Sequence, residues 1–217
     1  MLKVQFGCGL SNPSDWLNYD SSPTLFVRKL PFARQFARIV KHFLADDSSR
    51  LCANLNNVAN NKAAYGDIIK GLPCKDNSVD MLYASHVLEH LPLKEFRKSL
   101  NECRRILKPG GTFRAVVPNF RFYVDQYLSG TSPTKSIEFC LNSGLGAEYY
   151  VNPISRVLRG DAHHIMYDPQ ALEHELRCAG FNDVRQAFYG DSKKDFSSVE
   201  REDAWKYPNC VGFECIK

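Results

Sequence analysis

Short apolar runs alternate along the chain with longer segments in which apolar residues recur every three or four positions. The short runs predict buried strands, and they occur at residues 2–7, 16–19, 63–66, 79–84, 112–117, 184–188 and 211–216. Strands that alternate with helices form mostly parallel sheets that are covered on both faces. The order of the runs therefore predicts an α/β fold.

The longer periodic segments predict helices at residues 31–44, 93–107 and 169–179. Pro109-Gly110-Gly111 follows the second helix and is expected to stop it. Asp168 can cap the third helix, which has Pro169 at its first position and Gly180 just past its end. Residues 46–62 are polar and rich in Asn, so we expect a loop there.

The sharpest features of the sequence all follow predicted strands. They are Gly7-Cys8-Gly9, Asp20, Asp67, residues 86–90 and Pro118-Asn119. Open parallel sheets bind ligands beyond the carboxyl ends of their strands. Glycines there let the backbone approach a ligand closely because no Cβ intervenes. A carboxylate that ends the second strand can accept two hydrogen bonds from a ribose diol, so the combination suits a cofactor that contains adenosine.

Residues 66–119 read GDIIKGLPCKDNSVDMLYASHVLEHLPLKEFRKSLNECRRILKPGGTFRAVVPN. A Gly-Asp, a Leu-Pro, an Asn-Ser-x-Asp strand, a Val-Leu-Glu-His and a Lys-Pro-Gly-Gly follow one another here. In this order the chain resembles the small-molecule branch of the class I S-adenosylmethionine-dependent methyltransferases. The resemblance implies a Rossmann-like seven-stranded sheet with an antiparallel last strand, and S-adenosylmethionine as the cofactor.

The resemblance also implies the cofactor contacts. Gly7-Cys8-Gly9 is similar to the first motif of the family, Asp20 to its ribose carboxylate and Asp67 to the partner of the adenine amino group. Further contacts are expected from three residues near strand ends, namely Ile68, Ser85 and His86.

The first motif departs from the family pattern in three ways. Gln5 replaces an acidic residue and Ser11 replaces a third glycine. The interval from Gly9 to Asp20 is too short for a full crossover helix between parallel strands, so we expect an abbreviated first crossover. The run Trp16-Leu17-Asn18-Tyr19-Asp20 resembles that of predicted methyltransferases found near surface-polysaccharide genes.

Four of the six histidines lie in two short segments, SHVLEHL at residues 85–91 and DAHHIMYD at residues 161–168. One interpretation makes His163 or His164 a general base for a substrate hydroxyl, with His86 as a further catalytic candidate. Imidazole suits this role because it exchanges protons near neutral pH.

Two other interpretations of the same segments stay open. In the first, Glu89 and His90 are structural and pin a helix near the cofactor. In the second, Glu89, His90 and His164 hold a divalent metal, and the paired Glu-His and the later histidines resemble those of the metal-dependent small-RNA 2′-O-methyltransferases. We expect no resident metal, and these three residues are the ligand candidates if one is bound.

The segment between the second and third strands, residues 21–62, is expected to be a lid-like insertion. Its helix places apolar side chains on one face, those of Phe32, Phe36, Ile39, Val40 and Phe43. We expect this face to pack over the cofactor site. The basic residues nearby, Arg28, Lys29, Arg34, Arg38 and Lys41, are expected to be solvated, and the alternative is that they engage phosphate or a membrane surface.

Length and composition limit the remaining choices. The 217 residues suit a single domain, residues 1–217, with residues 120–160 as a variable segment on the substrate side. A net charge of +4 permits an anionic substrate without singling out nucleic acid. The eight cysteines form no C-x-x-C pair, and no apolar run reaches membrane-spanning length. We therefore expect a cytoplasmic protein with free thiols.

These observations predict an S-adenosylmethionine-dependent enzyme that O-methylates a small hydroxylated acceptor, such as a saccharide or a carrier-linked glycan. Residues 84–87 read ASHV, where enzymes that methylate the amino groups of adenine or glutamine carry an Asn-Pro-Pro-Tyr-like run. We expect contact with a membrane or a lipid-linked substrate as an option, and no nucleic-acid partner. The alternatives are a metal-dependent RNA 2′-O-methyltransferase and a non-catalytic module that binds S-adenosylmethionine.

Overall fold

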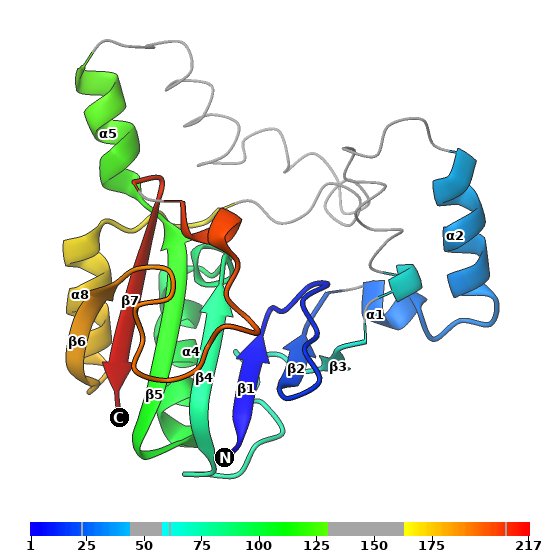
Figure 1. Cartoon of the computed structure of the whole chain (residues 1–217), viewed down its shortest axis with the longest axis horizontal. Coiled ribbons are helices and arrows are strands. Elements are labelled where there is room, and N and C mark those ends of the chain that lie inside the picture. The colour runs from blue at the N-terminus through cyan, green and yellow to red at the C-terminus, as the bar shows by residue number, and fades with distance from the viewer. Residues whose placement is uncertain (23, 44–57, 61, 130–162, 207) are drawn as a thin grey trace.

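The computed structural model describes residues 1–22, 24–43, 58–60, 62–129, 163–206 and 208–217. Seven strands form one sheet in the order β3-β2-β1-β4-β5-β7-β6 (Figure 1). They are β1 Lys3–Phe6, β2 Leu17–Asp20, β3 Ala64–Tyr65, β4 Val79–Ser85, β5 Leu107–Pro118, β6 Asn182–Ala187 and β7 Cys210–Ile216. Only β7 runs antiparallel to its neighbours β5 and β6. The predicted α/β sheet with an antiparallel last strand is confirmed.

Two helices, α4 Leu93–Ile106 and α8 Pro169–Cys178, lie together on one face of the sheet (Figure 1). Their buried side chains join the main hydrophobic core beneath that face. The start of α8 is as predicted, because the Asp168 carboxylate accepts a hydrogen bond of 2.7 Å from the Ala171 amide. The shorter elements are α1 Thr24–Val27, α2 Ala33–Phe43, α5 Phe120–Leu128, η1 Leu88–His90 and η4 Glu202–Trp205.

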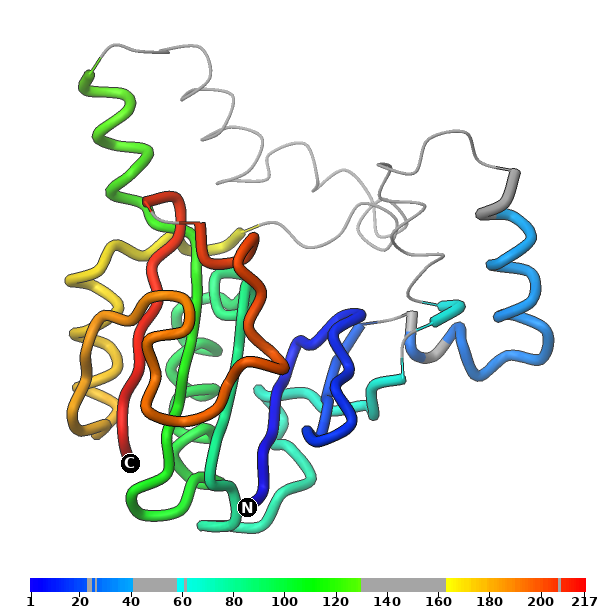
Figure 2. Tube along the Cα trace, viewed as in Figure 1, coloured from blue at the N-terminus to red at the C-terminus, as the bar shows by residue number. Residues whose placement is uncertain are grey.

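The opposite face of the sheet is covered by residues 188–205. This extended segment follows β6 and precedes β7 in the chain, and it crosses over the strands (Figure 2). Phe196, Val199 and Trp205 from this segment pack against Met81 and Tyr83 of β4 and against Trp16. The Trp16 indole also donates a hydrogen bond of 2.8 Å to Ser198. In the part of the chain that the structure describes, the abbreviated first crossover leaves this face without an α-helix, and the later segment covers it.

Pro109-Gly110-Gly111, expected to stop the helix ahead of the next strand, lies inside strand β5 instead. Helix α4 ends at Ile106, and β5 begins at once with Leu107. Gly110 adopts a φ of 77° and donates to the Lys217 carbonyl at 3.1 Å, and the Lys217 amide donates to Gly111 at 3.1 Å. The two glycines therefore form a turn in β5 whose backbone pairs with the carboxyl-terminal residue.

The insertion differs from the predicted lid in how α2 packs. Phe32, Phe36 and Ile39 are 78%, 66% and 57% exposed, and the buried side chain is that of Ala37, which contacts the segment 58–60. The expected packing of the Phe face over the cofactor site is therefore wrong. Residues 58–60, inside the predicted loop, are helical.

Some expectations concern residues that the structure does not describe. Asp161, Leu44, most of the predicted loop 46–62 and residues 130–160 of the substrate-side segment lie outside the described residues. The division into a lid-like insertion and a substrate-side segment stays a prediction. Within the described ranges, no helix has the length and apolar character needed to cross a bilayer.

Candidate functional site

A cavity of about 360 Å³ opens beyond the carboxyl ends of β1 and β4. Its wall combines the loop after β1, the end of β4 and the segment around η4, with Gly7, Cys8, Ser85, His86, Arg201 and Asp203 among its residues. A cavity of this volume at the carboxyl edge of a parallel sheet is where a small-molecule cofactor is expected. The structure therefore brings four of the predicted cofactor contacts into one wall.

The glycines of the first loop have separate functions. Gly7 has a φ of 62°, and a Cβ there would lie 2.1 Å from a methyl group of Val87. Gly9 has a φ of 51°, and a Cβ there would have open space around it. Gly7 is thus required by close packing and by the left-handed backbone, whereas Gly9 leaves its surroundings open to a ligand.

Gln5 and Ser11, which depart from the family pattern, are joined to each other. The buried Gln5 amide donates hydrogen bonds to the Ser11 carbonyl at 2.7 Å and to the Asn18 side chain at 2.5 Å. These bonds fix the loop after β1 onto β2. The neutral side chain thus anchors the loop without placing a carboxylate in the cavity wall.

Asp20 at the end of β2 holds the glycine loop. One carboxylate oxygen accepts from the Gly9 amide at 2.8 Å and the other from the Ser22 amide at 2.6 Å. A carboxylate can accept about four hydrogen bonds, so each oxygen keeps room for a ribose hydroxyl. Burial, and secondarily the charge of Asp20, raise the pKa of the Cys8 thiol to about 12. Cys8 is therefore a neutral thiol and a poor nucleophile.

Asp67 and Ile68 do not line the cavity. Asp67 accepts from the Ile69 amide at 3.0 Å and pairs with Lys70 at 3.0 Å, whereas the Ile68 side chain packs into the main core. Any contact of Ile68 with a cofactor must therefore use its backbone. Asp67 follows β3, two strands beyond β1.

The strand order places the candidate contacts in a row. Ser85 ends β4 and Asp20 ends β2, whereas Gly7 and Gly9 come after β1 and Asp67 comes after β3. Neighbouring strands lie about 4.8 Å apart, so the row spans about 14 Å. That length and the open Gly9 backbone fit an extended adenosine cofactor with its polar arm in the cavity between β1 and β4.

His86 has a partner at both nitrogens of its ring. It has a φ of 53°, its Nδ1 lies 3.3 Å from a Glu89 carboxylate oxygen, and its Nε2 lies 3.1 Å from the Ala204 carbonyl. Burial opposes the charged ring, but the Cys210, Glu89 and Ala204 acceptors outweigh it and raise the pKa of His86 to about 10. At neutral pH the ring is an imidazolium. An imidazolium has no free lone pair to take up a proton, so His86 can line the cavity as a cation but cannot act as a general base.

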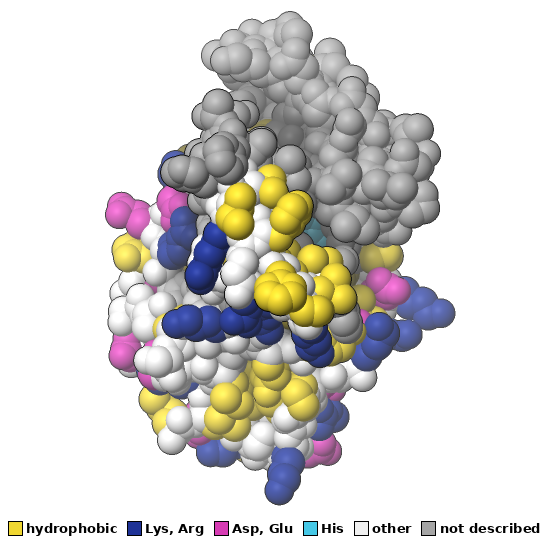
Figure 3. Space-filling view, turned by 90° about the vertical axis from the view of Figure 1, so that its right-hand side faces the viewer, with side chains coloured by type: hydrophobic (Ala, Val, Ile, Leu, Met, Phe, Trp, Pro, Cys, Tyr) yellow, Lys and Arg dark blue, Asp and Glu magenta, His cyan; other side chains and the backbone are white. Residues whose placement is uncertain are grey.

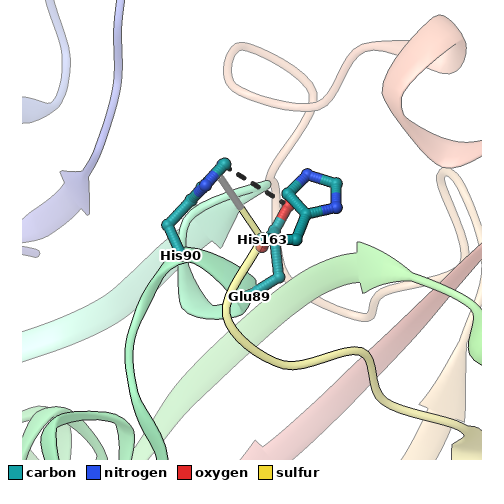
Figure 4. A group of neighbouring side chains, drawn as sticks. All are labelled: Glu89, His90 and His163. Atoms are coloured by element: carbon teal, nitrogen blue, oxygen red, sulfur yellow. Dashed lines mark ion pairs between the residues drawn. The ribbon is translucent and has the colours of Figure 1, made fainter. Parts of the chain in front are cut away.

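A second cluster lies next to His86 and consists of Glu89, His90 and His163. Figure 4 shows the carboxylate and both imidazole rings turned toward one another. One ligand atom from each residue lies within 4.8 Å of the others, and the two rings meet edge to face with centroids 4.9 Å apart. The sequence placed His164 in this group. Instead, the His164 amide donates to the Glu89 carbonyl at 2.8 Å, and in the described part of the chain His163 supplies the side chain.

The sequence did not point to the third wall of the cavity. Arg201 and Asp203, which pair at 2.5 Å, and Ala204 reach it from the segment between β6 and β7. No local motif marks these residues. Their position depends on long-range packing of Trp205 against β4, where its indole donates to the Tyr83 hydroxyl at 3.1 Å.

Comparison with known proteins adds a family. The family described as "Methyltransferase domain" matches residues 4–115, just over half of the chain. The chain is 30% identical over 174 residues to the tRNA N(3)-cytidine methyltransferase METTL2 of Danio rerio, a match that covers 80% of this chain and 42% of that protein. The METTL2 protein of Bos taurus is 28% identical over 109 residues, which cover 50% of this chain and 27% of that protein. The chain thus spans less than half the length of these curated relatives.

A solved structure of a SAM-dependent methyltransferase from Archaeoglobus fulgidus is 15% identical to the chain. The superposition covers 100% of this chain and 86% of that one, with a TM-score of 0.49.

Proposed function

The chain belongs to the methyltransferase-domain family, and on this premise we propose that it methylates a hydroxyl oxygen of a small acceptor, such as a saccharide or a carrier-linked glycan. The class I methyltransferase fold and S-adenosylmethionine as cofactor, both expected from the sequence, are confirmed. The acceptor and the residues that handle it are the proposal.

S-adenosylmethionine supplies a methyl group on a sulfonium, which leaves two tasks to the protein. The first is to hold cofactor and acceptor in line. For this we assign Gly7, Gly9 and Asp20 to the cofactor, with the imidazolium of His86 at the cavity wall. A fixed cation there suits the cofactor's carboxylate.

The second task is to ease the loss of the acceptor proton, because a hydroxyl oxygen is a weak nucleophile until that proton leaves. The observation that carries the proposal is the Glu89, His90 and His163 cluster, which lies beside His86 at the carboxyl edge of the sheet. A buried carboxylate and two imidazoles can receive a proton or bind an oxygen. We assign the acceptor hydroxyl to this cluster rather than to His86.

A panel of acceptors tests the proposal. The purified chain is incubated with S-adenosylmethionine and with matched pairs of saccharides that carry a hydroxyl or an amine at the same position. We expect the demethylated cofactor to form with the hydroxylated member and the product mass to rise by one methyl group. Transfer to the amines alone would contradict the proposal. Cofactor binding without transfer to any acceptor would also contradict it and would favour the non-catalytic module.

Asp20→Ala is expected to weaken cofactor binding by about 1–3 kcal/mol, because ribose hydroxyls lose a charged acceptor and Gly9 loses its partner. Calorimetric titration with the demethylated cofactor measures the change. Asp125→Ala is the matched control, since Asp125 is an exposed carboxylate that pairs with Arg121 on α5. Equal affinities of the Asp20 and Asp125 variants would remove Asp20 from the site.

Methylation of RNA is the second candidate, and the similarity to two tRNA methyltransferases favours it. The sequence predicted no nucleic-acid partner, and the curated relatives extend far beyond the matched region. Binding to tRNA measured across salt concentrations separates the candidates. A steep loss of affinity with salt indicates several phosphate contacts, whereas no binding leaves the small acceptor.

We further propose that the exposed face of α2 contacts an anionic lipid surface that presents a lipid-linked acceptor, and that the protein is cytoplasmic. Figure 3 looks onto the side that carries α2, where apolar and basic side chains lie next to one another. Phe32 and Phe36 are exposed, and Arg34 and Arg38 are exposed on the same helix. Aromatic and basic side chains together favour binding at the interface of an anionic membrane.

The double change Phe32→Ser and Phe36→Ser is expected to reduce binding to vesicles that contain anionic lipid by at least about tenfold, since apolar burial is lost. Co-sedimentation measures it. Phe120→Ser serves as control because Phe120 is exposed on α5, away from α2. Wild-type protein that does not co-sediment with the vesicles would contradict this part of the proposal.

A further inference from the structure

We propose that Glu89, His90 and His163 form a binding site for a divalent transition-metal ion such as Zn²⁺. Two imidazoles and one carboxylate are a ligand set that suits this ion. Its role in methyl transfer rests on the proposed function, whereas binding of the ion does not.

The distances between the ligand atoms are close to those that a metal needs. The Nε2 atom of His90 lies 4.0 Å from a Glu89 carboxylate oxygen, and all three ligand atoms lie within 4.8 Å of one another (Figure 4). Metal–ligand bonds of about 2.0–2.2 Å place neighbouring ligands of a tetrahedral ion about 3.4 Å apart. The side chains therefore need to move inward by about 1 Å, which small rotations supply.

The environment of Glu89 favours a bound cation. Its side chain is 0% exposed, and neither carboxylate oxygen accepts a hydrogen bond of good geometry from any residue that the structure describes. Isolated buried carboxylates are costly, so they are paired or bind metal. His86 forms an ion pair on one side of Glu89 at 3.3 Å. His90 approaches the same oxygen, Oε1, at 4.0 Å, and a ligand atom of His163 lies within 4.8 Å of both residues.

The ligands are positioned before any ion binds. Glu89 and His90 lie in η1, and the segment that carries His163 is tied to η1 by two hydrogen bonds. In these the His164 and Ile165 amides donate to the Glu89 carbonyl at 2.8 and 3.2 Å. His86 supports the ligating carboxylate from outside, as residues around metal ligands usually do.

Three protein ligands leave at least one coordination position open. An acceptor oxygen bound there would lose its proton to bulk water more readily, because the metal charge would stabilise the oxyanion. His163 then acts as a ligand and not as a base. The site would thus explain how a cluster without a free general base handles a hydroxyl.

Metal binding is measured directly on tag-free, metal-stripped protein. We expect one Zn²⁺ per chain by calorimetry and elemental analysis, and a visible absorption band on replacement with Co²⁺. Glu89→Gln and His163→Ala are each expected to lower the affinity by at least about 10–100-fold. His174→Ala, a histidine on α8 that contacts Cys178, should bind as tightly as wild type.

Affinity for the demethylated cofactor shows whether each variant is folded. Wild type that takes up no ion, or Glu89 and His163 variants that bind it as tightly as the His174 control, would overturn the metal site. Chelator-resistant methylation of hydroxyls by metal-free protein would refute a role of the ion in transfer while leaving the proposed function intact. A bound ion with no transfer to any hydroxyl would leave the site and refute the function.

Discussion

His163→Ala is expected to lower the rate of methyl transfer by about 10²–10⁴-fold while the affinity for the cofactor stays unchanged. The reason is that His163 belongs to the cluster assigned to the acceptor hydroxyl and does not line the cofactor cavity. Loss of a group that assists removal of the acceptor proton, directly or through a bound ion, typically costs this much. Single-turnover rates measured with saturating cofactor and acceptor report the chemical step directly.

The neighbouring histidine provides the comparison for this experiment. His164→Ala removes an imidazole one residue away but keeps the backbone amide that binds the Glu89 carbonyl. We expect its rate to stay within about threefold of wild type, far from the loss expected of a proton-handling group. A large loss for His164→Ala with a normal His163→Ala would assign the role to His164, which the sequence left open beside His163, and remove His163 from the site.

The features that sequence predicted well are those that depend on local pattern. Buried strands such as β4 are continuous apolar runs, and Asp168-Pro169 predicts the capped start of α8. The residues after strands then meet at one edge, because parallel strands end together. For this reason the sequence placed Gly7, Ser85 and His86 at one edge of the sheet, where all three line one cavity.

The features that sequence missed depend on contacts between distant segments. Periodicity identifies an apolar face on α2 but does not say what it packs against, and Phe32 and Phe36 are exposed. The segment over the second face of the sheet carries no motif, yet it supplies Arg201 to the cavity.

The histidine pair shows the same limit at the scale of one residue. His163 and His164 are adjacent, so composition cannot separate them. The hydrogen bond from the His164 amide to Glu89 fixes which imidazole reaches the cluster. The pairing of His86 with both Glu89 and Ala204, which makes it a donor, likewise joins three separate parts of the chain.

Arg114→Ala is expected to destabilise the fold by about 3–5 kcal/mol, because it leaves buried carboxylates without their cation. The Arg114 side chain is 0% exposed on β5, and its guanidinium pairs with Glu200, with Asp191 at 2.9 Å and with Glu214 at 3.2 Å. It also lies over the Trp205 ring, with 4.4 Å between the guanidinium carbon and the ring centroid. For a domain of this length the loss corresponds to a thermal midpoint lower by about 6–20 °C.

Two further variants decide whether the charge network is the cause. Arg97→Ala removes an exposed guanidinium that pairs with Glu175, and it should cost no more than about 1 kcal/mol. The double change Arg114→Met and Glu200→Met should recover part of the lost stability, since a buried ion pair replaced by apolar side chains is often neutral and Arg185 still pairs with Asp191 and Glu214. Because Glu200 precedes Arg201 in the cavity wall, Arg114→Ala should also weaken cofactor binding. An Arg114→Ala protein with the same thermal midpoint as wild type would contradict this prediction. It would mean that water or other groups solvate these carboxylates, and that apolar packing of Trp16, Phe196 and Trp205 holds the segment over the second face of the sheet.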